Sequence, residues 1–493
     1  MNFSIPLADI ICVSPAIILF LASLVPLTVK VLRNNREPNS IAALGYAVMG
    51  CIAAAGAAIS LHPKSSPTYH FANAIVVDGV SIFITVVVCV ITAVAAIMAR
   101  ENKSTSGSQF SEFLFLLLNS AVGMFLLAWS NDLIVTFIAI EIMSLCLYLL
   151  VALSHEEKLS KEAAFKYFVL GGVASAIFLY GTAFIYGISG STYLNDIAAN
   201  ASRLSEESYL FKVGVTLAII GLCFKVAIVP FHAWAPDVYE GAPTPVTAFM
   251  ATGVKVVTFI AFLRIMKLDV AGHDPKAALM VILQWLAALT MVAGNIAAII
   301  QQNLKRMLAY SSIAHSGYVL VGVIASMASG EAWRGDLSVI FYVTSYAIMT
   351  LGAFGIVSLL ENRETDMILV DDLKGLSKRN PIVALLFTIF LLSLAGIPPT
   401  IGFFGKFFIF SAALKQGFIW LAIWGAISSI ISAYYYLRPI VFMYMKDEEG
   451  VSVGAHYRIT FVVASALGVL TIVMGLMTEP LYQQVKAAVA SII

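Results

Sequence analysis

The chain has 493 residues, of which 60% are hydrophobic and only 12% are charged, and its mean hydropathy is +0.93. Soluble domains are roughly half apolar and a quarter charged, so this composition excludes a soluble protein. The net charge of +1 provides no basic surface for nucleic acid and no acidic tail for cations. We therefore divide the chain into membrane spans of about 20 residues that are joined by short connections.

Apolar runs long enough to cross a bilayer recur along the whole chain. They predict an all-α polytopic membrane protein of about fourteen transmembrane helices. The expected spans are 8–29, 41–61, 76–98, 111–129, 133–153, 163–188, 209–229, 243–264, 277–300, 306–327, 336–360, 381–412, 417–444 and 459–479. The expected linkers are 33–40, 62–75, 189–208 and 361–380. The N-terminal run lacks a preceding Lys or Arg, so we expect an uncleaved first helix.

The distribution of basic residues predicts the orientation of these spans. An even number of spans places both termini on one side of the membrane. Lys and Arg are more frequent in the connections that face the cytoplasm when the termini lie outside, for example at Arg33, Arg36, Lys305 and Lys378. The positive-inside rule therefore predicts periplasmic termini in a bacterial inner membrane.

Two of the expected spans carry helix-breaking residues in their apolar runs. Residues 381–412 would form a helix of about 48 Å, against a hydrocarbon core of about 30 Å, and their middle reads AGIPPTIGFFGK. The run 209–229 similarly ends in GLCFKVAIVPFHAW. Broken helices at corresponding positions predict two inverted five-helix repeats. We expect a three-helix region at 1–110, repeats at 111–267 and 277–444, and a C-terminal helix within 445–493.

Four ionisable residues are expected deep within the bilayer. Glu141 follows Asp132 by about 13 Å of helix, Lys255 lies at a similar depth, and Lys225 and Lys406 lie beside the helix breaks. A charge at the bilayer centre costs roughly 2.5–3.5 kcal/mol on insertion scales, so these residues indicate function. An amine in a low dielectric releases its proton more readily, and a nearby carboxylate reverses this effect. The hypothesis is a proton path in which Glu141 pairs with Lys225; the alternative is a static ion pair between helices.

Three further residues are candidates for the same path. Lys166 is about five residues inside its span, so its side chain can either join the path or extend to the interface. His232 in VPFHAW and His315 in SSIAHSGY can bridge lysines, because a neutral imidazole both donates and accepts. The alternative for each histidine is a simple hydrogen bond between helices. Neighbouring Tyr and Ser residues can either hold water or pack as polar groups.

The sequence contains no ligand set for a cofactor. The five cysteines are isolated in apolar runs, without CxxC or CxxxH spacing for zinc or iron–sulfur clusters. A phosphate-binding GxxxxGKS motif is absent, as is a GxGxxG that follows a strand. We therefore expect neither metal nor redox cofactor in this chain.

Three long motifs resemble the antiporter-like membrane subunits of respiratory complex I, the NADH-quinone oxidoreductase. They are KVAIVPFHAWAPDVYEGAPTPVTAFMATGVKVVTF (225–259), NLKRMLAYSSIAHSGYVLVG (303–322) and LAGIPPTIGFFGKFFIF (394–410). The resemblance implies that Glu141 and Lys225 form an input pair, that Lys255 is the central site and that Lys406 is the exit-side site. Lys406 favours the subunit N branch, because the subunit M branch carries a glutamate at the corresponding position.

The resemblance also implies the function and the partners. The expected function is proton translocation driven by electron transfer in partner subunits, which would hold the NAD, FMN, iron–sulfur and quinone sites. The expected partners are neighbouring antiporter-like and small membrane subunits and the lipid bilayer, with no nucleic acid. The alternatives are an ion-translocating subunit of a multisubunit sodium/proton antiporter or of a membrane-bound hydrogenase. An independent transporter or a passive scaffold fits less well with a row of buried charges.

Overall fold

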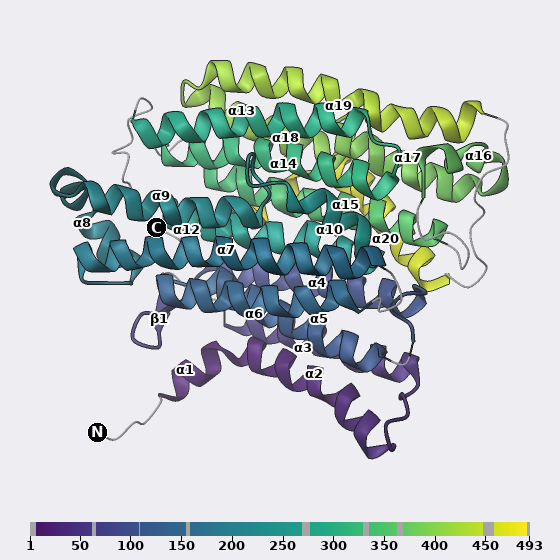
Figure 1. The fold of residues 1–493 in the computed structure, drawn as a ribbon, viewed down its shortest axis with the longest axis horizontal. Coiled ribbons are helices and arrows are strands. Elements are labelled where there is room, and N and C mark those ends of the chain that lie inside the picture. Colours follow the sequence, from purple (N-terminus) through teal and green to yellow (C-terminus); the bar gives the residue numbers. More distant parts are fainter. Residues whose placement is uncertain are drawn as a thin grey trace.

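The structure, a computed structural model, describes residues 6–61, 66–107, 109–153, 158–268, 277–328, 335–361, 368–446 and 458–490. Within these ranges the chain is a bundle of helices with one short two-stranded hairpin. Most of the helices run side by side along the long axis of the molecule (Figure 1).

The elements follow one another in this order, with their bounds. The first half comprises α1 (Leu7–Cys12), α2 (Ser14–Leu32), α3 (Ser40–Ser60), β1 (Thr68–His70), β2 (Ile75–Val77), α4 (Gly79–Glu101), α5 (Phe110–Trp129), α6 (Leu133–Ala152), α7 (Lys158–Ser189), α8 (Leu194–Glu207), α9 (Tyr209–Lys225), α10 (Trp234–Gly241), α11 (Thr244–Phe249), the π-helical turn η1 (Met250–Val254) and α12 (Lys255–Met266). The second half comprises α13 (Ala278–Ile299), α14 (Leu304–Met327), α15 (Gly335–Leu360), the 3₁₀ turn η2 (Val370–Leu373), α16 (Leu376–Arg379), α17 (Pro381–Ala395), α18 (Ile401–Lys415), α19 (Ile419–Met445), α20 (Arg458–Leu476) and α21 (Glu479–Ala490).

The predicted all-α membrane fold is confirmed. Twelve helical segments among the described residues are long and apolar enough to span a membrane, and each coincides with a predicted span. The two remaining predicted spans are the interrupted ones. The first stops at Lys225, where α9 ends, and the second stops at Ala395, where α17 ends, before α18 resumes at Ile401.

Several connections are more ordered than the sequence predicted. The expected linker 189–208 contains the amphipathic helix α8, and the linker 62–75 contributes β1, which pairs antiparallel with β2. Residues 62–65, and residues 362–367 of the last expected linker, lie outside the described part of the chain. The first expected span is divided at Val13, and a further helix that was not predicted, α21, begins at Glu479 after α20 ends at Leu476.

Two matching backbone bridges support the inverted repeats. Leu133 N donates to Thr192 O (2.9 Å) at the start of α6, and Leu304 N donates to Ile368 O (2.9 Å) at the start of α14. Each helix is the second of its expected repeat. The Asp132 side chain caps the N-terminus of α6, and the Asn303 side chain caps that of α14. The connections that they meet lead into α8 and α16, which lie at opposite ends of the bundle (Figure 1). The domain boundaries themselves stay a prediction.

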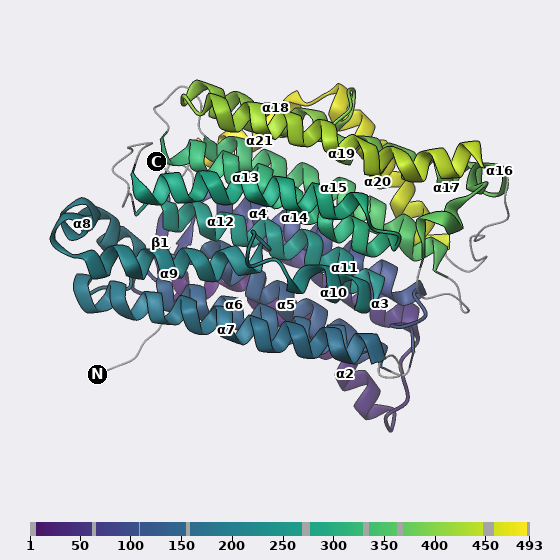
Figure 2. The same ribbon diagram turned by 45° about the horizontal axis from the view of Figure 1, so that its top comes forward.

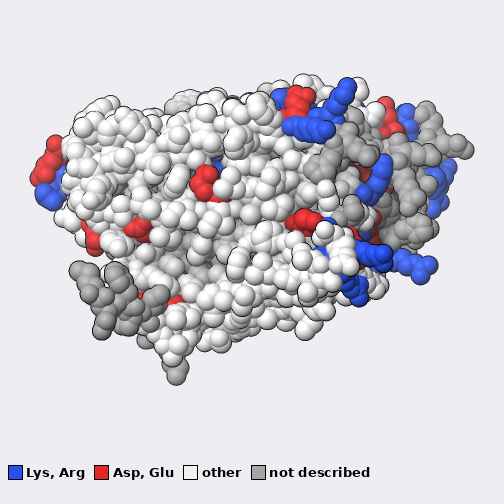
Figure 3. All heavy atoms as spheres, turned by 60° about the horizontal axis from the view of Figure 1, so that its bottom comes forward, with Lys and Arg blue, Asp and Glu red and all other residues white. Residues whose placement is uncertain are grey.

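Burial separates central helices from peripheral ones. In the most apolar stretch of each helix, every residue is buried in α11–η1–α12 and 94% of the residues are buried in α14 and in α15. The corresponding share is only 28% in α2 and 33% in α20. Figure 2 shows α12, α14 and α15 between the early and the late helices. On the face in Figure 3, most charged side chains lie toward one end and a few toward the other, and the surface between them is largely uncharged apart from an acidic group near the middle. This pattern suits a lipid-facing exterior with polar ends.

Candidate functional site

Lys225 is held at the point where α9 breaks. Gly221 brings α9 close to α7, since a Cβ at this position would lie 2.7 Å from Phe178 Cβ. The Lys225 side chain is 2% exposed, and its Nζ donates to Ser144 Oγ on α6 (2.8 Å). The Tyr148 ring centroid is 5.8 Å from Nζ. The ammonium group is therefore enclosed by a hydroxyl and aromatic rings.

Glu141 lies one helical turn before Ser144 on α6. The two positions share a face because residues three apart are neighbours on a helix. The structure has no ion pair between Glu141 and Lys225, and Glu141 Oε1 is buried without a hydrogen-bond partner in the described part of the chain. The input pair expected from the sequence is thus not in direct contact here. The Ser144 hydroxyl takes the ammonium group instead.

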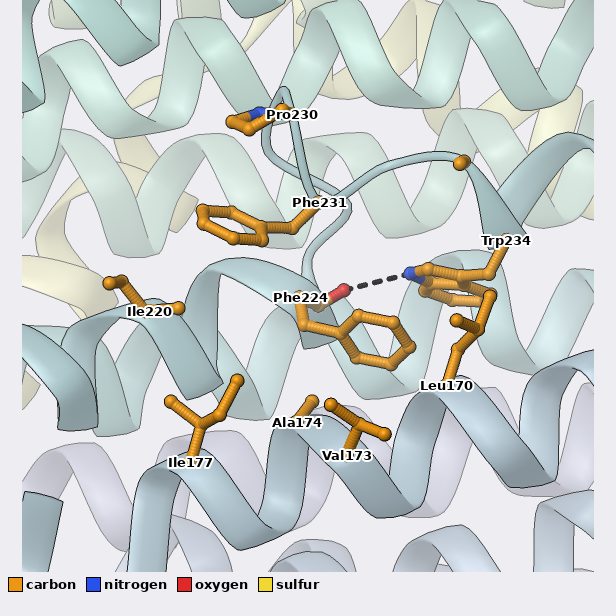
Figure 4. A pocket seen from close by; sticks show the side chains of 10 residues that line it. Leu170, Val173, Ala174, Ile177, Ile220, Phe224, Pro230, Phe231 and Trp234 are labelled. Atoms are coloured by element: carbon orange, nitrogen blue, oxygen red, sulfur yellow. Dashed lines mark hydrogen bonds between the residues drawn. The ribbon is translucent and has the colours of Figure 1, made fainter. Parts of the chain in front are cut away.

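The break between α9 and α10 exposes backbone groups that other helices satisfy. Val226 O accepts from Ser316 Oγ (2.6 Å), Val229 N donates to Thr290 Oγ1 (3.0 Å), and Trp234 Nε1 donates to Phe224 O (3.0 Å). Figure 4 shows this last bond beside an apolar cavity of about 240 Å³ between α7, α9 and the break. These bonds hold the irregular segment in place at membrane depth, where unsatisfied backbone groups are costly.

His232 lies on the same irregular segment. Its Nδ1 is buried and has no hydrogen-bond partner among the described residues. The structure therefore places His232 beside the break of α9, but it does not connect the imidazole to a lysine.

Lys255 occupies the first position of α12, directly after the π-helical turn η1. Such π-helical turns are frequent at functional sites, and this one ends at Val254, directly before Lys255. The side chain is 4% exposed; Nζ donates to Ser312 O and to Ser316 Oγ (2.8 Å) on α14. Because Ser316 also donates to Val226 O (2.6 Å), a single hydroxyl connects the central lysine to the break beside Lys225.

His315 lies on α14 between the serines that contact Lys255. It is 1% exposed, and its Nδ1 lies 2.6 Å from the Tyr342 hydroxyl while Nε2 lies 3.0 Å from the Tyr436 hydroxyl. Tyr436 also forms a hydrogen bond with Ser311. A neutral imidazole donates at one nitrogen and accepts at the other, so this arrangement can pass a proton between two hydroxyl groups.

Lys406 lies on α18, six residues after Thr400, the N-cap residue at which the second break ends. It is 4% exposed, and Nζ donates to Ala395 O (2.9 Å), a carbonyl released at the end of α17, and to Ser429 Oγ (2.9 Å). The Tyr318 ring centroid is 4.9 Å from Nζ. In the described part of the chain, neither Lys255 nor Lys406 forms an ion pair within 4.0 Å.

Lys166 is separate from the buried lysines. Its side chain is 40% exposed and forms ion pairs with Glu162 (2.7 Å) and Asp237 (2.7 Å). Asp237 also pairs with Arg306 (2.8 Å), which in turn pairs with Glu240 (2.7 Å). Lys166 therefore belongs to a partly exposed ion-pair cluster, as expected for a side chain that extends away from the membrane centre.

Some polar residues around the lysines were missed from the sequence. They are Ser144, Ser316 and Ser429, which receive the three ammonium groups, and Tyr342 and Tyr436, which flank His315. Apart from the family motif around His315, no local pattern distinguishes these residues from packing serines and tyrosines. Asp237 and Glu240 could have been identified as candidates from the sequence, since these two acidic residues interrupt an apolar stretch in PDVYEG.

The described residues offer no group of three or more His, Cys, Asp or Glu side chains that could hold a metal ion. The candidate site is instead a set of buried amines with one carboxylate and one imidazole, which come from α6, α9, α12, α14 and α18. This fold and this set of residues define an antiporter-like membrane subunit. The sequence profile of the family described as "NADH:quinone oxidoreductase/Mrp antiporter, TM" matches residues 130–432.

Individual relatives narrow this class. The chain is 51% identical over 487 residues to NADH-quinone oxidoreductase subunit N of Bdellovibrio bacteriovorus, covering 99% of both chains. A chain of respiratory complex I from Thermus thermophilus is 31% identical, with a TM-score of 0.81 over 96% of this chain and 100% of that one. A chain of the Mrp complex from Dietzia sp. DQ12-45-1b shares the fold at 22% identity, with a TM-score of 0.81 over 99% of this chain and 97% of that one. The chain belongs to the family of NADH-quinone oxidoreductase subunit N.

Proposed function

We propose that this protein translocates protons across the bacterial inner membrane as one membrane subunit of a proton-translocating NADH-quinone oxidoreductase. The observation that carries the proposal is the burial of three lysines, each at most 4% exposed, without a carboxylate counter-ion in the described part of the chain. An unpaired ammonium group at the bilayer centre is expensive, and stability alone gives no reason to retain three of them.

The proposed path begins at Glu141 and Lys225. The Ser144 hydroxyl accepts from Lys225 Nζ (2.8 Å), donates to Ile140 O (2.6 Å) and lies one helical turn from Glu141 on the same face of α6. A small movement of the lysine or glutamate side chain would join or separate the two charges. The path continues to Lys255, whose amine donates to the Ser316 hydroxyl (2.8 Å), and Ser316 in turn donates to Val226 O beside Lys225 (2.6 Å). A backbone carbonyl does not pass a proton on, so transfer between the two lysines requires water at this point. Loading Lys255 would raise the electrostatic energy of Lys225 and favour release of its proton, because like charges repel strongly in a low dielectric.

The second half of the proposed path runs from His315 to Lys406. The Tyr318 ring contacts His315 edge-on at 5.6 Å and faces the Lys406 ammonium group at 4.9 Å. The structure has no direct hydrogen bond from Lys255 to His315 or from His315 to Lys406 among the described residues. Proton transfer across these two steps requires water or a rotation of the tyrosines. His232 and Lys166 are assigned to the edge of the path, at the first break and at the ion-pair cluster.

The energy for translocation would come from partner subunits. The relatives are named as subunits of an oxidoreductase, and we infer that NAD, FMN, iron–sulfur clusters and quinone bind elsewhere in the complex. This chain would act as the translocase part, in contact with neighbouring antiporter-like and small membrane subunits. We also propose periplasmic termini, since the connections at the opposite end carry more Lys and Arg.

The alternative is an ion-translocating subunit of a sodium/proton antiporter or a membrane-bound hydrogenase. The shared fold with the Mrp complex favours it only at the level of architecture. Purification of the tagged chain in mild detergent separates the two functions. Flavin and iron–sulfur subunits in stoichiometric amount, with NADH-driven proton uptake by vesicles that Lys255→Ala abolishes, are the expected result. Co-purification with antiporter subunits alone would overturn the proposal.

A further inference from the structure

The last span is bent at membrane depth. Ile459 N and Thr460 N donate to Glu101 at the end of α4 (3.0 and 2.8 Å), which fixes the start of α20 at that end of the bundle. The helix stops at Leu476, and α21 begins at Glu479 and continues toward the opposite end (Figure 2). Two residues, Met477 and Thr478, form the bend.

Two contacts fix the depth of this bend. Gly475 lies against the second helix break, because a Cβ at Gly475 would collide with Pro399 O. Further on, the Tyr482 ring lies 5.4 Å from the Phe408 ring on α18. Glu479 lies between these two contacts along the chain, and therefore at the level of the first turns of α18, where Lys406 is found.

The distance from this level to the end of the bundle follows from the length of α18. This helix continues to Lys415, and its 15 residues correspond to about 22 Å. Glu479 therefore lies on the order of 15 Å inside the end of the bundle, within a hydrocarbon layer of about 30 Å.

Glu479 nevertheless faces outward. Its side chain is exposed, as are Leu476 (66%) and Met477 (68%) beside it. The apolar side of α21, with Leu481 and Val485, is buried and packs against α4 and α15. The opposite side carries Glu479, Gln483 and Lys486, and Gln484 lies at its edge; all four are exposed, and we call them the polar face of α21.

Lipid is a poor neighbour for this face. Glu479 Oε1 accepts a hydrogen bond from Gln483 Nε2 (2.5 Å), which neutralises no charge. Lys486 on the same helix lies about 10 Å further along the axis, toward the end of the bundle. A carboxylate in contact with acyl chains is costly, and lipid headgroups lie too far toward the interface to pair with it at this depth. A second copy of the chain also fits poorly. Two copies share one orientation in the membrane, so a two-fold interface through this point would bring Glu479 against Glu479.

We propose that the polar face of α21 is the docking surface for a transmembrane helix of a neighbouring membrane subunit, which places a Lys or Arg side chain beside Glu479. This inference rests on the proposed function, because it requires a complex with several membrane subunits. The basic partner follows from charge complementarity at a depth where water is scarce. Gln483 and Gln484 would add hydrogen bonds across the interface, as polar side chains do between transmembrane helices.

Photo-crosslinking in the intact complex tests the surface directly. A benzophenone amino acid is placed at Gln483, with Glu206 on α8 as the matched exposed control at the polar end of the bundle. The expected result is a crosslink from position 483 to one multi-pass subunit of the same purified complex, and none from position 206 to that subunit. Crosslinks to lipid alone at position 483, in a complex that is otherwise complete, would overturn the proposal.

Charge reversal then tests the partner. Glu479→Lys should reduce retention of this chain in the native complex by at least about tenfold, whereas Glu206→Lys should not change it. Reversing the basic residue on the crosslinked helix should restore retention of Glu479→Lys. Unchanged retention of Glu479→Lys, or no rescue, would refute the charge pair. In those cases NADH-driven pumping that depends on Lys255 would leave the proposed function intact; absence of redox subunits from the wild-type purification would remove the function itself.

Discussion

Replacement of Lys255 by arginine tests whether this position must release its proton. Lys255→Arg keeps a positive charge beside the Ser312 carbonyl and the Ser316 hydroxyl. Arginine holds its proton about three pH units more tightly than lysine in water, and its guanidinium stays charged in proteins. Three units correspond to about 4 kcal/mol, or about a thousandfold smaller population of the neutral form. We therefore expect pumping by Lys255→Arg to fall to the background.

Lys166→Arg is the matched control. Lys166 is 40% exposed and pairs with two carboxylates, an arrangement that an arginine can reproduce. Its pumping should stay close to that of the wild type. The assay is the number of protons translocated per electron pair in oriented vesicles, with assembly verified on native gels. Full pumping by Lys255→Arg would show that this position needs only a fixed positive charge, and the lysine relay would have to be withdrawn.

Three further predictions concern other parts of the site. Glu141→Gln and Lys225→Ala should each lower pumping by about tenfold or more while the complex still assembles, and vesicles of either variant that pump normally would return both residues to a structural role. Gly396→Ala should lower pumping at normal subunit content, because Gly396 has φ +86° and a Cβ would lie 2.9 Å from Lys406 Cδ; wild-type pumping would show that Lys406 tolerates displacement. The isolated chain should show no NADH oxidation and no flavin, haem or iron–sulfur absorbance, and a stoichiometric chromophore in its spectrum would contradict this.

Hydropathy determined the number and type of the spans, because a bilayer of fixed thickness demands an apolar helix of nearly fixed length. The positions of the two helix breaks were also predictable from the sequence. Proline and glycine remove donors and helical preference wherever they occur, and they predicted the interruptions after Lys225 and before Lys406. The same rules failed for α8 and α21, whose polar faces and short lengths do not produce a long apolar run.

The contacts of each charged residue were decided only by the tertiary structure. The sequence placed Glu141 near the bilayer centre and Lys225 beside a helix break and predicted that the two would pair, yet in the structure the Lys225 ammonium group donates to Ser144 on α6 instead. The link from Lys255 through Ser316 to Val226 joins three segments that lie far apart in the chain. The free energy of inserting a charged side chain into the bilayer depends only on the residue and on its depth, so it can be inferred from the sequence. Hydrogen bonding depends on how two helices face each other, and that is fixed by the packing of the whole bundle.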